Sequence, residues 1–335
     1  MNILIIGAGQ LGSRHLQSLL KVPSKLKIYV VDQSHDSLSL AKSRAAEIAN
    51  KANTEVVYHT GLDKITNTSF FLTIVATGAA PRLSILRDVF NRFKSKNIIL
   101  EKFLFQDLES YAVAKSLIDS SSASVFVNCP LRTYPIFKTI KKEISLSNDP
   151  IHMHYSGGDW VGLACNSIHY IDLLAFLGDV KLQAVDCSNL DSEIIPSKRI
   201  GHIEFTGTII YHYSDGAYLE FQSLRGSQID STITIRFGET SFEIDELSGN
   251  YNYYQGSSLI RKDRYDVPYQ SDLTQNVFDQ LLRDDTCDLP TYEESSGYHK
   301  MFLIEMLSAY NQIPNCFHSV LLFLFKFNLG DLHRV

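Results

Sequence analysis

The sequence has no excess of basic residues, no paired cysteines and no long apolar run. Its 335 residues include 31 lysines and arginines against 37 aspartates and glutamates, a net charge of −6. This balance leaves no general basic surface for phosphates, which argues against nucleic acid as the main partner. The five cysteines form no Cys-x-x-Cys pair, so they indicate neither a disulfide framework nor a zinc site. We expect a cytoplasmic protein without a bound metal.

Membrane-targeting signals are also missing. The opening residues carry no basic region ahead of their apolar run and enter a glycine turn at once, which indicates a strand and not a secretory signal. The longest late apolar run, residues 320–325, is far shorter than the roughly 20 residues needed to cross a bilayer. We therefore expect no membrane partner.

Length and pattern predict two domains, the first of them α/β. The chain exceeds the roughly 100–200 residues of a usual domain. From residue 2 to about 128, short β-branched runs alternate with helical stretches at 11–20, 37–49, 83–94 and 108–120. Such alternation is typical of βαβ units that build a parallel sheet. We predict a Rossmann domain, a doubly wound parallel sheet, over residues 1–128.

The rest of the chain has a different pattern of polar and apolar residues. Helical apolar stripes at 136–144 and 167–176 are followed, between 181 and 244, by several runs of alternating polar and apolar residues. These runs indicate an antiparallel sheet with one wet face. Helical patterns return at 272–283 and 292–310. We predict an α+β domain with an open, mostly antiparallel sheet over 129–310, and a tail of uncertain structure at 311–335.

A glycine motif follows the first strand directly. It has the G-x-G-x-x-G spacing and consists of Gly7, Ala8, Gly9, Gln10, Leu11 and Gly12. The first glycine permits a tight turn, the second lets the backbone approach a pyrophosphate, and the third allows close helix–strand packing. The helix that starts at Gln10 and Leu11 offers free N–H groups and a positive dipole to phosphate. The loop therefore predicts a bound dinucleotide.

An acidic residue at the end of the second strand supports this prediction. Asp32 comes twenty residues after Gly12, where a carboxylate can accept hydrogen bonds from both adenosine ribose hydroxyls. Gln33 and Ser34 follow instead of an arginine, so a 2′-phosphate would meet a negative charge and NAD is favoured over NADP. Enzymes that bind S-adenosylmethionine share the loop and the acidic strand end, but the third glycine argues against them.

A later strand ends on small and hydroxyl residues, Thr77 and Gly78. Such residues are expected where the chain passes close beneath a bound cofactor. An ordinary strand end is the alternative.

Three motifs in order give the chain a family resemblance. They are the glycine loop with Arg14 and His15 behind it, Glu101-Lys102 at the end of a strand, and the Asn166 to Asp172 segment that opens a helix. Over about residues 1–310 the chain resembles the Gfo/Idh/MocA oxidoreductases. The resemblance implies a substrate site between the two domains, a sheet that mediates dimers or tetramers, and hydride transfer to or from sugars, inositols or nucleotide sugars.

The resemblance also implies roles for the Glu101-Lys102 pair. Glu101 and Lys102 are expected beside the cofactor, with Lys102 as the group that exchanges a proton with the reacting hydroxyl. A lysine partly buried beside a nicotinamide cation should have a depressed pKa, which suits that role. Phe103 stands where the family commonly has a proline whose peptide bond is often cis. Because phenylalanine makes a cis bond cost a few kcal/mol more, the resemblance does not carry the backbone geometry over to Lys102.

Further candidates lie in the second half of the chain. His169 matches the family's histidine and is expected to relay a proton or bind the reacting oxygen, with a structural histidine as the alternative. Asp172, one helical turn later, is expected to touch substrate or to orient His169. Cys165 stands where the family commonly has an aspartate, which leaves Lys102 as the better proton-transfer group. Arg132 is expected either to bind an anionic group of the substrate or to lie solvated beside a turn.

The sequence favours an NAD-dependent dehydrogenase of a carbohydrate-like substrate that assembles as a homodimer or homotetramer. Two alternatives remain at this stage. One is a non-catalytic NAD-binding sensor, suggested by the missing aspartate and proline. The other is an enzyme that retains NAD and uses it transiently for elimination or glycoside cleavage.

Overall fold

The computed structural model describes residues 1–49, 52–197 and 202–312. The described residues divide into two compact units, one of residues 1–133 with 268–296, and the other of 134–267 with 297–312. The expected boundary near residue 128 lies close to this division. Residues 268–296, which we assigned to the second domain, pack with the first unit instead. Of the tail expected at 311–335, residues 311 and 312 end a helix, and the rest lies outside the described residues.

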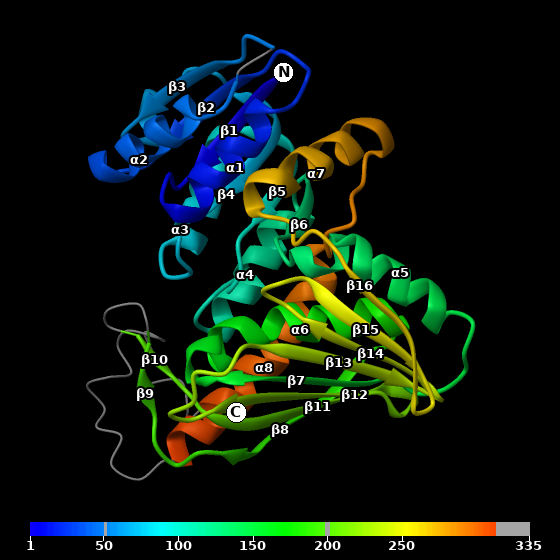
Figure 1. Ribbon diagram of the computed structural model, residues 1–335. Helices are drawn as coiled ribbons and strands as arrows, with labels where there is room; N and C mark the ends of the chain where they lie inside the picture. Colours follow the sequence, from blue (N-terminus) through cyan, green and yellow to red (C-terminus); the bar gives the residue numbers. More distant parts are fainter. Residues whose placement is uncertain (50–51, 198–201, 313–335) are drawn as a thin grey trace. The chain divides into compact units, whose positions relative to one another are not determined.

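The first unit contains a six-stranded parallel sheet with the order β3-β2-β1-β4-β5-β6 (Figure 1). Its strands are β1 (Asn2–Ile6), β2 (Lys27–Val31), β3 (Glu55–His59), β4 (Ser69–Val75), β5 (Lys94–Leu100) and β6 (Ser124–Val127). The connecting helices are α1 (Gln10–Leu20), α2 (His35–Ala46), α3 (Arg82–Arg92) and α4 (Leu108–Asp119). The predicted doubly wound Rossmann sheet is confirmed, with its topological switch point between β1 and β4.

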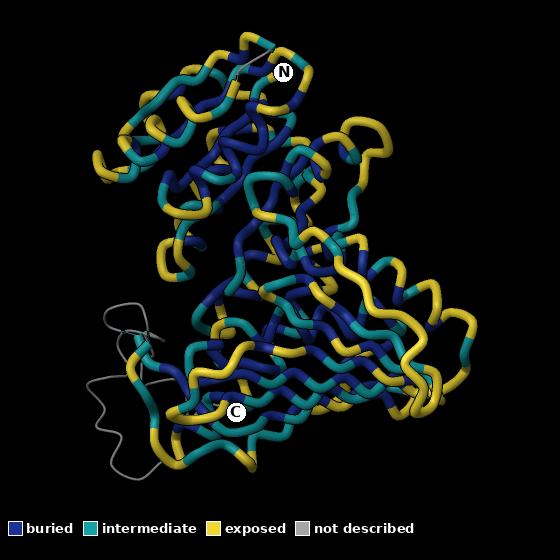
Figure 2. Tube along the Cα trace, viewed as in Figure 1, coloured by how far each residue is buried: buried dark blue, intermediate teal, exposed yellow. Residues whose placement is uncertain are grey.

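The central strands β1 and β4 consist mainly of apolar residues, because helices cover both faces of the sheet. Residues 3–6 of β1 and 72–75 of β4 are buried throughout, as Figure 2 shows by the dark tube there. Helix α7 (Gln270–Asp284) adds Val277, Phe278 and Leu281 to the same core. Its sequence shows an apolar stripe but not which sheet the stripe covers, so the expected domain boundary missed it.

The second unit contains an eight-stranded sheet with the order β16-β15-β14-β13-β7-β12-β11-β8. Its strands are β7 (His152–Gly158), β8 (Leu182–Leu190), β11 (Gly207–Tyr213), β12 (Tyr218–Leu224), β13 (Thr232–Phe237), β14 (Thr240–Asp245), β15 (Asn250–Gln255) and β16 (Ser258–Arg264). All pairs are antiparallel except β7 with β12, so the prediction of an open, mostly antiparallel sheet is confirmed. A separate short pair is formed by β9 (Ile195–Pro196) and β10 (Ile203–Glu204).

Three helices complete the second unit: α5 (Pro135–Ile144), α6 (Leu163–Gly178) and α8 (Tyr292–Gln312), the last of which begins in residues assigned to the first unit. Helix α6 packs on the sheet through Tyr170, whose ring centroid lies 4.3 Å from that of Tyr155 and 5.2 Å from that of Phe221. It begins four residues earlier than the pattern predicted, so Cys165 lies inside its first turn. Strand residues on the sheet face opposite to Tyr155 and Phe221, such as His154 and Gln222, are partly exposed.

Candidate functional site

The glycine loop between β1 and α1 has a geometry that requires glycine at two positions. Gly7 has φ +94°, and a Cβ there would lie 2.8 Å from the carbonyl oxygen of Ala76 at the end of β4. A Cβ at Gly12 would lie 1.8 Å from the carbonyl oxygen of Gly7. Both contacts are closer than real Cβ atoms approach, so a side chain at either position would push the loop away from the sheet.

Gly9 is open where its neighbours are crowded. A Cβ built on Gly9 would have no atom of the described chain within 4 Å. Gly9 is also the N-cap of α1, and that helix end has no side-chain cap and no acidic residue in its first turn, where Gln10 and Leu11 lie. The first N–H groups of α1 therefore lack a side-chain acceptor from the N-cap, and the helix dipole is positive there, an arrangement suited to an anion.

Asp32 is fixed against this loop. One carboxylate oxygen accepts a hydrogen bond from the amide of Ala8 at 2.7 Å, and the other accepts from the amide of Ser34 at 2.8 Å. Each oxygen can accept a second hydrogen bond. The carboxylate is thus held in place with acceptor capacity for two hydroxyl groups.

Thr77 and Gly78 follow β4, which is the neighbour of β1 in the sheet. The side-chain oxygen of Thr77 is buried and hydrogen-bonds to no other group in the part of the chain that the structure describes. Gly78, like Gly9, faces open space in that part. Because the carboxyl ends of β1 and β4 meet at the switch point, where open α/β sheets bind their ligands, these residues fit a dinucleotide such as NAD.

Sequence reasoning missed a cation at this loop. Arg44 on α2 donates to the carbonyl oxygen of Gln10 at 2.9 Å, to the hydroxyl of Ser13 at 2.7 Å and to the side-chain oxygen of Gln10 at 2.6 Å. It lies on the next helix, so the G-x-G-x-x-G spacing carries no signal for it. Its guanidinium ties α2 to the first turn of α1.

Behind β5, five polar side chains form a closed ring of hydrogen bonds. Nε2 of His15 donates to Oε1 of Glu101 at 2.8 Å, and Asn128 donates both to Glu101 at 2.8 Å and to Gln270 at 3.0 Å. Gln270 donates to Thr274 at 3.1 Å, and the Thr274 hydroxyl lies 2.8 Å from Nδ1 of His15. Since the Glu101 carboxylate only accepts, Nε2 of His15 carries a proton.

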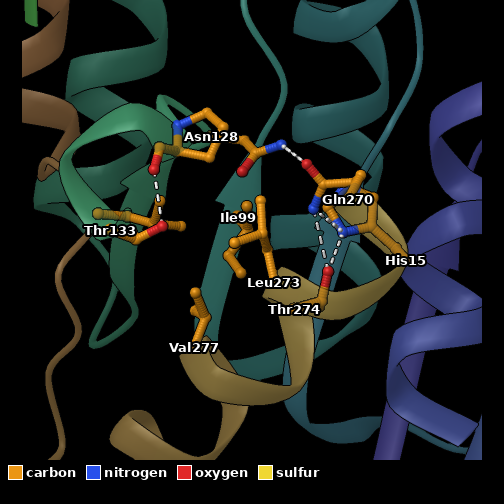
Figure 3. Close-up of a pocket in the computed structure, with 10 residues that line it drawn as sticks. His15, Ile99, Asn128, Thr133, Gln270, Leu273, Thr274 and Val277 are labelled. Atoms are coloured by element: carbon orange, nitrogen blue, oxygen red, sulfur yellow. Dashed lines mark hydrogen bonds between the residues drawn. The ribbon is translucent and has the colours of Figure 1, made fainter. Parts of the chain in front are cut away.

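Four members of the ring, His15, Asn128, Gln270 and Thr274, line a small pocket, together with apolar side chains that include Ile99 and Leu273 (Figure 3). Glu101 itself is only 3% exposed. Burial alone raises the pKa of Glu101, but hydrogen bonds from His15 and Asn128 and the charges of His15 and Arg82 outweigh it and hold the pKa below its ordinary value. Glu101 therefore anchors the end of β5 as a carboxylate, and its burial leaves little surface for the cofactor contact that we expected.

Lys102 follows Glu101 at the end of β5 and is partly exposed. The peptide bond between Lys102 and Phe103 is cis. Lys102 belongs to the first unit, which also contains the glycine loop and Asp32.

Arg132 lies in a short 3-10 helix, Pro130–Thr133, and is 8% exposed. The alternative of a solvated arginine beside a turn is therefore wrong. Its burial fits a guanidinium held in a fixed position within the first unit.

The remaining candidates belong to the second unit. His169 is partly exposed on α6, and Asp172 one turn later has no exposed surface, which fits orientation or packing and not contact with a ligand. In the first turn of α6, the amide of Ala164 donates to Glu204 at 2.8 Å. Burial raises the pKa of Glu204 despite hydrogen bonds from Cys165 and Ala164. A carboxylate from β10 thus caps the helix beside Cys165, a contact that the sequence did not reveal.

Two other kinds of site are absent from the described residues. They contain no group of three or more histidine, cysteine or acidic side chains placed to hold a metal ion. Within the same residues, no helix combines the length and apolarity that a membrane span needs.

Comparisons with known proteins agree with this geometry. Residues 1–129 match the family model described as "Oxidoreductase family, NAD-binding Rossmann fold". A search of curated protein sequences finds no match to the chain.

Solved structures match over both units. A levoglucosan dehydrogenase in complex with NADH and levoglucosan is 13% identical, with a TM-score of 0.70 over 94% of this chain and 99% of that one. An oxidoreductase from Agrobacterium radiobacter in complex with NAD+, L-tartaric acid and magnesium is 13% identical, with a TM-score of 0.69 over 93% and 96%. A Sinorhizobium meliloti protein assigned as a myo-inositol dehydrogenase is 13% identical, with a TM-score of 0.67 over 93% and 98%.

At such low identity these likenesses show the fold alone, and the family assignment depends on the match of residues 1–129. Residues 1–129, which carry the glycine loop, Asp32 and the Glu101-Lys102 motif, match the model of the Gfo/Idh/MocA family of NAD-binding oxidoreductases.

Proposed function

We propose that this protein catalyses reversible hydride transfer between NAD and a hydroxyl or keto carbon of a sugar, an inositol or a nucleotide sugar. One observation carries the proposal: the open backbone at Gly9 lies in a loop to which Asp32 is fixed through the amide of Ala8. A pyrophosphate and an adenosine ribose need these two features side by side.

Different residues of the first unit bind different parts of the cofactor. The first turn of α1 receives the pyrophosphate, Asp32 accepts from the ribose hydroxyls, and the Thr77 hydroxyl supplies a hydrogen bond to the remainder of the dinucleotide. When bound, NAD supplies the hydride acceptor or donor. We favour NAD over NADP because the Asp32 carboxylate would repel a 2′-phosphate.

Lys102 exchanges the proton of the reacting oxygen. It follows directly on Glu101, and the ring around Glu101 fixes the backbone from which the lysine side chain extends. His169 is the second candidate for proton transfer. Arg132 is our candidate for an anionic group of the substrate, and Asp172 acts through His169.

The test is a spectrophotometric screen of sugars, inositols and nucleotide sugars with NAD and with NADP. Lys102→Ala should lower kcat by about 10²–10⁴-fold, the usual contribution of a general acid–base group. Lys94→Ala, at the opposite and exposed end of β5, is the matched control and should leave kcat unchanged. Binding of NAD without turnover of any substrate would favour a sensor, and turnover without net NADH would favour elimination or glycoside cleavage.

We further propose that the protein forms a homodimer or homotetramer through the open face of the eight-stranded sheet. That face carries partly exposed polar and ring side chains, among them His154, Tyr218 and Gln222. Light scattering on the purified protein gives the stoichiometry, and Gln222→Glu combined with His154→Glu should dissociate the assembly by placing like charges on the contact.

The scattered cysteines favour the cytosol as the compartment.

A further inference from the structure

A buried arginine links the two segments that we expect beside the cofactor. Arg82 is the first residue of α3 and has no exposed surface. Its guanidinium donates to three backbone carbonyl oxygens: that of Thr77 after β4, and those of Phe103 and Leu104 after β5, the last at 2.7 Å. None of the motifs in the sequence includes it.

The position of Arg82 explains this reach. Side chains of a helix tilt toward its N-terminus, and α3 begins just past the end of β4, so the side chain of its first residue points back over the carboxyl ends of the strands. Two adjacent parallel strands end there, β4 before Thr77 and β5 before Lys102. A planar guanidinium can donate to several acceptors at once from one rigid fork, which the single ammonium of a lysine cannot reproduce.

The charge of Arg82 is retained in spite of its burial. Burial lowers the pKa of Arg82 to about 10, against the opposing effect of Glu101 and Tyr111. The group therefore stays protonated near neutral pH, and its hydrogen bonds to the three carbonyl oxygens are charge-assisted.

We propose that Arg82 is the positioning residue of the active site, which fixes the backbone of Phe103 and Leu104 relative to Thr77 and so sets the direction in which Lys102 points. Its role in catalysis rests on the proposed function, whereas its action on the backbone does not. Arg82 touches backbone atoms only among these partners, so it acts through Lys102 and Thr77 and not on the substrate.

The test uses the full-length protein with Arg82→Lys, and with Arg87→Lys as the matched control, since Arg87 lies on the same helix and is exposed. Hydrogen exchange without cofactor should show at least tenfold faster exchange for amides 103–106 in Arg82→Lys. Competitive labelling with acetic anhydride should show the Lys102 amine reacting at least threefold faster, relative to Lys115. The control should match the wild type in both measurements.

Calorimetry then separates the nicotinamide from the rest of the cofactor, because ADP-ribose lacks only that ring. Arg82→Lys should weaken NAD binding at least fivefold and leave ADP-ribose binding within twofold, because in the proposed function Asp32 and the glycine loop hold the adenosine and the pyrophosphate. Arg82→Ala should recover NAD affinity when guanidinium ion is added at low, non-denaturing concentration.

Unchanged exchange at 103–106, or equal loss of NAD and ADP-ribose binding, would overturn the inference. So would loss of folding in both variants, since Arg82 would then support the unit as a whole and not this segment. A wild-type protein that binds neither NAD nor ADP-ribose would instead overturn the proposed function, with the exchange and labelling results still deciding whether Arg82 holds the segment.

Discussion

Alanine at Gly12 and alanine at Gly9 should have opposite consequences, although both residues lie in one loop. At Gly12 the added methyl would lie 1.8 Å from the carbonyl oxygen of Gly7, which is backbone and cannot rotate away. Overpacking of this kind costs roughly 1–3 kcal/mol, and the severity of the contact points to the upper end. The higher helix propensity of alanine offsets about 1 kcal/mol of this cost. We therefore expect the free energy of unfolding to fall by about 2 kcal/mol.

At Gly9 the same methyl would meet nothing within 4 Å in the described chain. The backbone there has a negative φ, −68°, on the side of the Ramachandran map that alanine occupies. The poorer N-cap character of alanine and its smaller unfolded-state entropy offset each other, so stability should stay within about 0.5 kcal/mol of the wild type. The methyl would fill the space that a pyrophosphate needs, and NAD affinity should fall at least tenfold, or about 1.4 kcal/mol.

Thermal unfolding without cofactor and calorimetric titration with NAD measure the two effects separately. Gly12→Ala should lower Tm by about 4–8 °C for a unit of this size. Gly9→Ala should unfold at the wild-type temperature and show the weaker NAD binding in the titration. The reasoning is refuted if Gly9→Ala binds NAD like the wild type, or if it loses as much stability as Gly12→Ala.

Three further predictions follow from buried or fixed charges. Asp32→Ala should lower NAD affinity about tenfold or more by removing charge-assisted hydrogen bonds, and should reduce the preference for NAD over NADP in the same titrations; an unchanged ratio would contradict the role of Asp32. His15→Leu should lower the free energy of unfolding, measured in urea, by about 3–5 kcal/mol, because it leaves the Glu101 carboxylate buried without that partner. Adding Glu101→Leu should recover part of this loss. Burial raises the pKa of Glu246 above its ordinary 4.5, although Tyr170 and Ser231 donate to the carboxylate. Folding therefore favours the protonated form, and the stability from this group is complete below pH 4.5 and lost as the pH rises through the folded pKa. Glu246→Gln should raise the free energy of unfolding at pH 8 and not at pH 4, and an equal effect at both pH values would contradict this reasoning.

Local sequence determined the first unit in large part. Its strands are short apolar runs between helical stretches, and this alternation depends on neighbours in the chain. The glycine loop could also be predicted, since Gly7 needs a positive φ and a Cβ at Gly12 would meet the carbonyl oxygen of Gly7, only five residues earlier. Asp32 followed from its place at the end of the next strand.

The second sheet was predicted less completely. Its order places β7 between β12 and β13, although β7 precedes both by many residues in the chain. Alternation of polar and apolar residues indicates a strand with one wet face but not its neighbours, because pairing depends on backbone groups that every sequence has.

The support of the candidate site was decided by the tertiary structure alone. His15 and Thr274 hydrogen-bond across 259 positions of the chain, and Arg82 reaches carbonyl oxygens that any residue at Phe103 or Leu104 would offer. The sequence by itself indicated the residues that we propose for dinucleotide binding, because the turn and the strand end that carry them follow from local sequence. Only the tertiary structure decided what holds them in place, because buried hydrogen bonds join groups that no periodicity or spacing connects.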